Sequence, residues 1–281
     1  MLSTLLLLGS LAAPHLGAGA LPPTPFPVQD EDLEALLDEY EEALKDRESS
    51  DQAIALMDRL TSRFKTTVER LAEVRDDLEL GQGDAKALKA EAKALEKELD
   101  EIAEAVHRAF VHKRRKRVTQ ENLRLWTAAA YALGQMGERG AKYLWKAFED
   151  KKFKKEPDFR GLLLEQIGYT HAYDYADELM KQLDSYEYLF IAKAADALAQ
   201  FAEAPGEVRR EIVGTMVKLY AQNYEDALQN QNDPEKQEKY RKTSGSMARA
   251  LEALTGTQQR DPVAWNRWWN EHKKDDSVWT P

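Results

Sequence analysis

The most regular pattern of apolar and polar positions lies between Met57 and Ala109. Apolar side chains recur there every seven residues in two series, which stop at residues 81–84 and then resume. A seven-residue repeat of this kind is typical of two helices that pack as a coiled coil. Before the break the series are Met57, Phe64, Leu71, Leu78 and Leu60, Thr67, Val74; after it they are Leu88, Leu95, Ile102, Ala109 and Ala92, Leu99, Val106.

A single fold at Gly83 brings the two halves into register. The facing pairs are then Leu78 with Leu88, Leu71 with Leu95, Phe64 with Ile102 and Leu60 with Val106. Gly81 or Gly83 can adopt the left-handed conformation that ends the first helix, and Asp84 can cap the second. We therefore predict an antiparallel coiled-coil hairpin whose arms have about 30 residues and extend about 45 Å.

Shorter helical patterns follow the hairpin in pairs. The predicted pairs are 122–136 with 141–148, 157–168 with 175–183, and 191–201 with 208–228, and a fourth core helix covers 247–254. If Gly134, Gly168 and Ala199 are equivalent positions, the repeats are 34 and 31 residues long, which is the spacing of helical-pair repeats. The polar stretch Gln229–Lys242 departs from this spacing, and we predict that it is an inserted loop or a helix extension.

An amphipathic helix is predicted upstream of the hairpin at 30–47, because apolar residues recur there at spacings of three and four. They are Leu33, Leu36, Leu37, Tyr40 and Leu44. The polar residues Ser49–Asp51 break this helix and begin the next one. Gln52, three residues after Ser49, suggests a capping box at that start.

The first 20 residues have the character of a secretory signal. Leu2–Ala13 is apolar, and Ala18–Ala20 fits a small-x-small cleavage site, although no Lys or Arg lies near Met1. A retained anchor is the alternative, but Pro14 makes this segment a poor membrane-spanning helix. We predict a signal peptide at 1–20, a proline-rich linker at 21–29, and export to the periplasm or the extracellular space.

The amino-acid composition excludes several kinds of catalytic and metal site. The chain has 281 residues, a net charge of −10 and no cysteine. Disulfides, thiolate metal sites and cysteine nucleophiles are therefore excluded, and the negative charge disfavours binding to nucleic acid. The five histidines lack metal-ligand spacing, and no phosphate-binding loop or nucleophile motif occurs. We predict no catalytic residue, no metal and no cofactor.

Two clusters are candidates for binding. The first is the basic run Lys113, Arg114, Arg115, Lys116 and Arg117 after His112. We interpret it as a solvated boundary that pairs with acidic residues such as those at 30–39, with binding of an anionic surface or polymer as the alternative.

The second cluster is aromatic and comprises Tyr169, His171, Tyr173, Tyr175, Tyr186, Tyr188 and Phe190. Packing between adjacent helices is the simpler interpretation of these rings. Tyrosine also suits a recognition surface, because it offers a rigid ring with a polar tip. If the chain has a binding groove, we expect this cluster, together with Lys142 and Lys146, to form its wall.

The C-terminal region has a tryptophan-rich helix. Asp261 can cap it and Pro262 fits its first turn, and the tryptophans at 265, 268 and 269 share one face. A solenoid needs such a cap over its last repeat. A tryptophan patch that faces carbohydrate or a membrane is the alternative.

The segments Ala132–Gly137, Leu251–Gly256 and Asp261–Trp269 resemble exported bacterial HEAT-repeat proteins, in which a Leu-Thr-Gly turn precedes a proline-initiated tryptophan helix. The resemblance covers about residues 120–274. It implies an α-solenoid that binds other macromolecules, and it supplies no catalytic motif. It does not extend to the hairpin.

We therefore expect an all-α protein with a helical hairpin domain at 30–111 and a HEAT-like repeat domain with a tryptophan-rich cap at 118–275. The expected function is a non-catalytic scaffold or adaptor of the cell envelope that binds a protein partner. An accessory or lyase-like HEAT protein with a small ligand, and an anionic-polymer or surface binder, are the alternatives. No stable membrane span is expected after signal cleavage, and the hairpin offers a route to a homo-oligomer.

Overall fold

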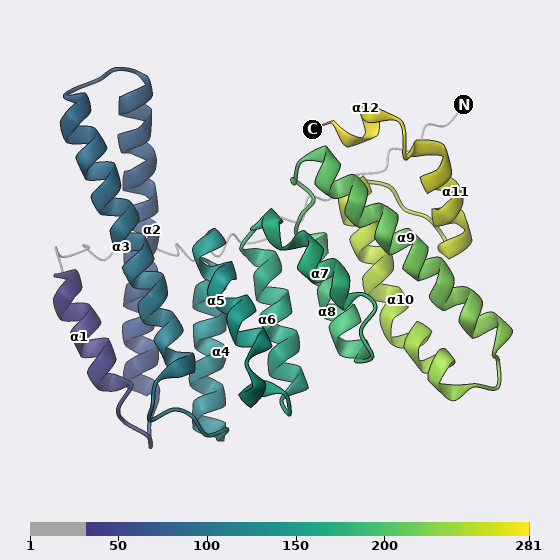
Figure 1. The fold of residues 1–281 in the computed structure, drawn as a ribbon, viewed down its shortest axis with the longest axis horizontal. Coiled ribbons are helices and arrows are strands. Elements are labelled where there is room, and N and C mark those ends of the chain that lie inside the picture. The colour runs from purple at the N-terminus through teal and green to yellow at the C-terminus, as the bar shows by residue number, and fades with distance from the viewer. Residues whose placement is uncertain (1–31, 281) are drawn as a thin grey trace, which may run out of the picture. The chain divides into compact units, whose positions relative to one another are not determined.

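The computed structural model describes residues 32–280, and all of their regular structure is helical (Figure 1). Twelve α-helices and two short 3-10 helices account for it, with no strand in this part of the chain. The prediction of an all-α protein is confirmed. The predicted signal peptide at 1–20 and the linker at 21–29 lie outside the described residues.

The seven-residue pattern corresponds to the two longest described helices, α2 (Asp51–Glu79) and α3 (Ala85–Val111). They lie side by side and are joined by a short turn (Figure 1). Gly81 and Gly83 in this turn have left-handed φ values of 66° and 83°. The Asp84 side chain accepts a hydrogen bond from the backbone N–H two residues later, so it caps α3 as predicted.

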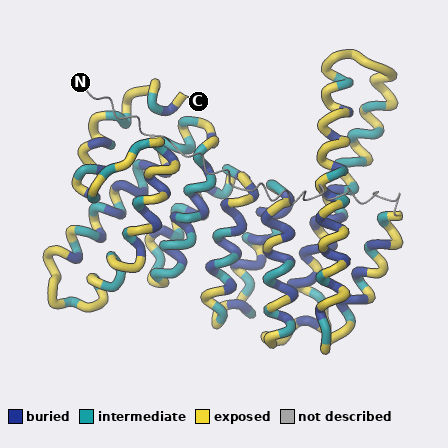
Figure 2. Tube along the Cα trace, turned by 180° about the vertical axis from the view of Figure 1, so that it is seen from behind, coloured by how far each residue is buried: buried dark blue, intermediate teal, exposed yellow. Residues whose placement is uncertain are grey.

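Ion pairs across the α2–α3 seam show that the two helices run in opposite directions. They join Arg63 to Glu98 and Arg70 to Glu91, each at 2.7 Å, so partner numbers fall along α3 as they rise along α2. Burial decreases toward the turn, where residues 81–87 are exposed or nearly so (Figure 2). In Figure 1 this end of the pair extends beyond α1 and α4.

The helix α1 (Leu33–Ala43) packs against α2 and α3 through the predicted apolar face. The predicted capping box of Ser49 and Gln52 does not form. Ser50 is the N-cap of α2, and its side chain makes no cap bond. Its hydroxyl instead donates to the Glu121 carbonyl at 3.2 Å, so a tertiary contact replaces the local motif.

The next seven α-helices follow the predicted pairs closely. They are α4 (Gln120–Gly134), α5 (Gly137–Glu149), α6 (Pro157–Tyr169), α7 (Ala176–Gln182), α8 (Tyr188–Ala199), α9 (Gly206–Gln229) and α10 (Pro234–Thr255), with 3-10 helices η1 (Lys151–Phe153) and η2 (Tyr173–Tyr175) between them. Helix α4 packs on α5 and α6, α6 on α8, α8 on α10, and α9 on α10. One apolar core runs through these contacts. The polar stretch Gln229–Lys242 is a short turn and the first part of α10, so the helix-extension alternative is confirmed.

Close helix packing explains one of the glycines that mark the repeat. A Cβ atom added to Gly168 in α6 would lie 2.6 Å from the Cα and the carbonyl oxygen of Ala197 in α8. No side chain fits there unless the backbone moves, because real Cβ atoms do not approach backbone atoms so closely. The small residue therefore sets the distance between α6 and α8.

The chain ends with α11 (Pro262–His272) and α12 (Asp276–Trp279), which both contact α9. The Asp261 carboxylate accepts a hydrogen bond from the Ala264 N–H at 2.8 Å, which confirms the predicted cap. Helix α12 was not predicted, although its Trp279 is buried. None of the described helices is both long and apolar enough to cross a lipid bilayer.

Candidate functional site

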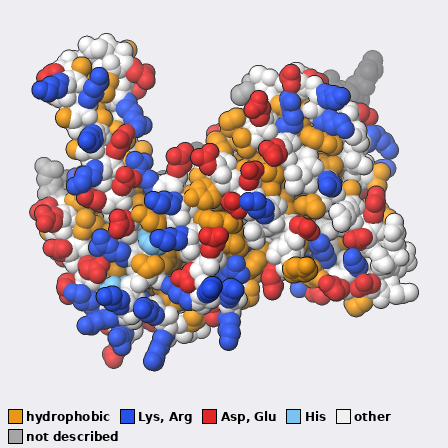
Figure 3. Space-filling view, viewed as in Figure 1, with side chains coloured by type: hydrophobic (Ala, Val, Ile, Leu, Met, Phe, Trp, Pro, Cys, Tyr) orange, Lys and Arg blue, Asp and Glu red, His pale blue; other side chains and the backbone are white. Residues whose placement is uncertain are grey.

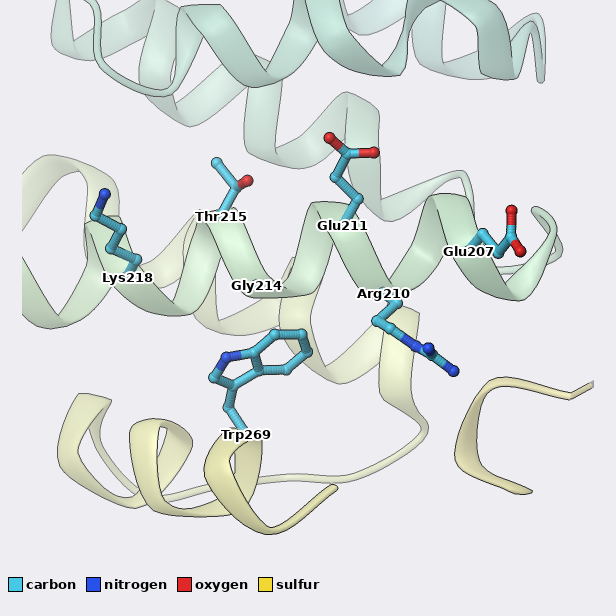
Figure 4. Close-up of a pocket in the computed structure, with 7 residues that line it drawn as sticks. All are labelled: Glu207, Arg210, Glu211, Gly214, Thr215, Lys218 and Trp269. Carbon is cyan, nitrogen blue, oxygen red and sulfur yellow. The ribbon is translucent and has the colours of Figure 1, made fainter. Parts of the chain in front are cut away.

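The three tryptophans of α11 have different surroundings. Trp265 and Trp268 are buried, as expected for a cap, whereas Trp269 is only partly covered. Figure 4 shows the Trp269 ring rising from α11 toward α9 at Gly214. A Cβ atom on Gly214 would lie 2.7 Å from Cζ2 of this ring. The glycine therefore lets the indole approach the α9 backbone.

Two hollows meet at Trp269 and together form what we call the α9–α11 groove. The larger has a volume of about 620 Å³ and the smaller about 290 Å³. Both are lined by Gly214, Lys218 and Trp269. The larger adds Glu207, Arg210, Glu211 and Thr215, and the smaller adds Val217, Ala221, Gln222, Glu225, Asn266 and Asn270. The groove has a ring on one wall, and in Figure 4 the side chains of Glu211 and Thr215 lie across α9 from it.

The charges of the groove are mostly negative. Glu207, Glu211 and Glu225 form no ion pair within residues 32–280, so no described side chain neutralises them. Arg210 is engaged elsewhere, because its guanidinium pairs with Asp276 at 2.5 Å. Lys218 is the remaining cation of the lining. A cationic ligand is therefore favoured here over an anionic one.

This combination suits binding of an amphipathic segment. The exposed face of an indole offers flat apolar area at little cost in conformational entropy, which is why tryptophan is enriched among binding hot spots. Carboxylates beside it add charge selectivity. The described residues contain no group of three or more His, Asp or Glu side chains placed to hold a metal ion.

The members of the predicted aromatic cluster differ in their surroundings. The Tyr173 ring packs edge-on against Phe201, with centroids 5.1 Å apart. Tyr175 lies 6.3 Å from Trp145, and the Tyr188 hydroxyl donates to the Glu235 carbonyl at 3.3 Å. Each of the three half-buried tyrosines thus contacts a different part of the helical array.

The other members of the cluster are more exposed. Tyr169 is 46% exposed and Tyr186, in the turn between α7 and α8, is fully exposed. His171 is exposed and has a φ of 53° in the turn after α6. Phe190 is buried against Phe148, at a centroid distance of 5.6 Å. The cluster thus includes buried, half-buried and exposed residues.

Lys142 and Lys146 are exposed residues of α5 whose charges act on His107 of α3. The buried His107 ring stacks on Tyr143, with centroids 4.4 Å apart and an interplanar angle of 20°. Burial, with added repulsion from Lys146, Lys152 and Lys142, lowers the pKa of His107 to about 4. The lysines therefore help to keep this imidazole neutral, while the packing contact between α3 and α5 is made by His107 and Tyr143.

The structure differs from the prediction for the basic run in two respects: Arg115 is buried, and the exposed cations of the run form no ion pair with acidic residues in the described part of the chain. Arg115 is fully buried, not solvated. Its guanidinium donates to the carbonyls of Leu44 and Ser49 and to the side chains of Ser50 and Asn122, at 2.9–3.1 Å. We call this arrangement the Arg115 clasp. It joins the α1–α2 turn to the α3–α4 turn.

Sequence reasoning missed the α9 side of the groove. Glu207, Glu211 and Gly214 are separated from Trp269 by more than fifty residues, and no local motif connects them. The available signal was Gly214 itself, because a glycine inside a helical pattern often marks a close approach by another group.

Comparisons with protein-family models, with curated proteins and with solved structures give no match to this chain. The likeness to exported HEAT-repeat proteins therefore stays a prediction from the sequence.

Proposed function

We propose that this protein is a non-catalytic, exported scaffold that binds a segment of a partner protein in the α9–α11 groove. The observation that supports this most is Trp269, whose partly exposed ring lies on Gly214 where two hollows meet. A partly exposed tryptophan whose ring packs against a glycine is held in place and is suited to bind an apolar side chain.

The negative charge of the groove favours a ligand segment that carries positive charge. Glu207, Glu211 and Glu225 line it without ion-pair partners in the described part of the chain. The ligand is therefore a segment with an apolar side chain flanked by Lys or Arg. Its apolar side chain contacts Trp269, and its cations lie near the three carboxylates.

We also propose that α2 and α3 form a coiled coil and that α4–α11 form a HEAT-like solenoid. The opposing seven-residue series and the descending ion pairs support the first. Packing of successive helices along one continuous core supports the second. In such a scaffold the groove lies at the C-terminal end, next to the tryptophan-rich cap.

A peptide-binding measurement tests this function. Short fluorescent peptides with one Trp, Phe or Leu between lysines would be titrated with the full chain. A second set of peptides, with Glu in place of each Lys, serves as the comparison. We expect saturable binding of the basic peptides only. Trp269→Ala should weaken it by about tenfold or more, because it removes the apolar anchor.

Charge variants separate the groove from general attraction. Replacing Glu207, Glu211 and Glu225 with Gln should weaken binding, whereas Glu69→Gln with Asp76→Asn and Glu79→Gln on α2 should not. The control set is exposed and removes the same number of carboxylates. Equal affinity for wild type and Trp269→Ala, with both folded by circular dichroism, would contradict the proposal.

A further inference from the structure

The basic run is not the only cationic segment at its end of the molecule. Residues Lys151–Lys155 add four lysines around Phe153. Lys152 donates to the Phe110 carbonyl, next to the basic run, and the Phe110 and Phe153 rings meet at a centroid distance of 6.2 Å. The segments 113–117 and 151–155 therefore lie side by side, and we call them the basic edge.

Both segments are anchored by buried groups. Arg115 and Phe153 are fully buried. The ammonium group of Lys152 lies over the rings of Trp126 and Phe153, 5.1 and 4.5 Å from their centroids. Because these three side chains point inward, the others on the edge are held toward solvent.

Seven cations on this edge are exposed and form no ion pair within the described residues. They are Lys113, Arg114, Lys116, Arg117, Lys151, Lys154 and Lys155. They outnumber the unpaired carboxylates nearby, Glu149, Glu156 and Asp158. Figure 3 shows Lys and Arg side chains gathered along the lower edge of the molecule, below α4 and α5. Such a concentration is unexpected in a chain with a net charge of −10.

Apolar side chains accompany the cations. Val111 and Val118 flank the basic run and are 48% and 40% exposed. The aromatic ring of the edge, Phe153, is buried and offers no stacking platform. Single-stranded nucleic acids are bound largely by stacking on exposed rings, whereas anionic membranes attract basic residues with interspersed apolar ones.

We propose that the basic edge docks on an anionic lipid surface. The cations attract the headgroups and the two valines contact the outer part of the acyl layer. Attraction between exposed charges extends only about 8–10 Å at physiological salt, so acidic residues farther away oppose it weakly. This surface is separate from the α9–α11 groove, and its use does not depend on the proposed peptide binding.

Vesicle co-sedimentation of the full chain tests this inference. The vesicles contain phosphatidylcholine alone, or with about one phosphatidylglycerol in four lipids. The readout is the difference in bound protein between the vesicles with and without phosphatidylglycerol. Binding through an apolar N-terminal segment would be the same for both vesicle compositions and does not contribute to this difference. We expect the edge variant Lys113→Gln, Lys116→Gln, Lys151→Gln, Lys154→Gln to lose it by at least about tenfold.

A matched control removes four exposed lysines from the hairpin: Lys65→Gln, Lys86→Gln, Lys89→Gln, Lys93→Gln. It should bind as wild type does, and Trp269→Ala should too. The proposal is overturned if wild-type binding does not depend on phosphatidylglycerol. It is also overturned if the edge variant binds as strongly as the control variant. Edge-dependent binding to a DNA duplex without binding to vesicles would also overturn it, in favour of a polyanion site.

Discussion

Arg115 differs from its neighbours in the basic run because it is the one whose guanidinium reaches four acceptors at once. A buried guanidinium is tolerated only when its donors are satisfied, and here the acceptors come from the α1–α2 turn and from the first turn of α4. The sequence placed Arg115 among residues of the same type, so nothing local distinguished it. Its role depends on Leu44 and Ser50, more than sixty residues earlier.

Replacement of Arg115 by Ala should destabilise the fold strongly. The variant leaves Ser50, Asn122 and two carbonyls without their donor in a buried site, and we expect a loss of about 3 kcal/mol in the free energy of unfolding. Urea denaturation followed by circular dichroism measures it. Arg114→Ala, at an exposed neighbour, should change stability by no more than about 0.5 kcal/mol. Equal effects of the two substitutions would show that the clasp contributes nothing.

His107 gives the fold a predictable pH dependence. Its folded-state pKa of about 4 lies below the value of about 6.5 expected in the unfolded chain, so the unfolded state binds the proton more readily. The stabilising contribution of the neutral ring is complete above about pH 6.5 and is lost as the pH falls toward 4. The loss is on the order of 2–3 kcal/mol.

The variant His107→Phe isolates this effect, because phenylalanine can keep the contact with Tyr143 but cannot bind a proton. Urea titrations at about pH 7 and pH 4.5 should show a smaller fall in stability for the variant than for wild type. If both proteins lose the same free energy between these pH values, His107 is not the group responsible.

At the level of helices, the apolar pattern was a good guide because each element has its own amphipathic period. The Gly83 fold point, the Asp84 and Asp261 caps and the helix pairs could all be inferred locally. The local approach failed at the start of α2, where the N-cap is Ser50 and its hydroxyl makes a tertiary bond, and at α12, which is too short to show a period.

The proposed coiled-coil register can be tested by crosslinking. The chain has no cysteine, so a pair introduced at Leu78 and Leu88 reports only on their contact. Facing positions should form a disulfide under mild oxidation, whereas Leu78→Cys with Leu95→Cys, one step out of register, should not. Non-reducing electrophoresis separates the two results. Preferential crosslinking of the second pair would refute the register.

At the level of the whole molecule, contacts join helices that are near neighbours in the chain. A core built in this way is sensitive to damage mainly close to the damaged helix, because each unit is stabilised by its neighbours. The α9–α11 groove depends on tertiary packing, because its residues come from two helices that must lie against each other. This is why the pattern of apolar residues could predict the helices but not the groove.

Trp265→Ala tests this local behaviour. Loss of a buried tryptophan typically costs about 3–5 kcal/mol, and we expect amide hydrogen exchange to accelerate in α9–α11 while α2 and α3 keep their protection. Val263→Ala, at a residue of α11 that is 54% exposed, is the control. Uniform acceleration across all helices would show instead that the chain unfolds as one unit.

The outer end of the α2–α3 pair, beyond the residues that touch α1 and α4, has a consequence for how this protein could vary. Seven residues added to each arm would move the turn outward by about 10 Å and leave the remaining helices as they are. Reach is therefore a length that can be adjusted in discrete steps, independently of the surfaces used for attachment.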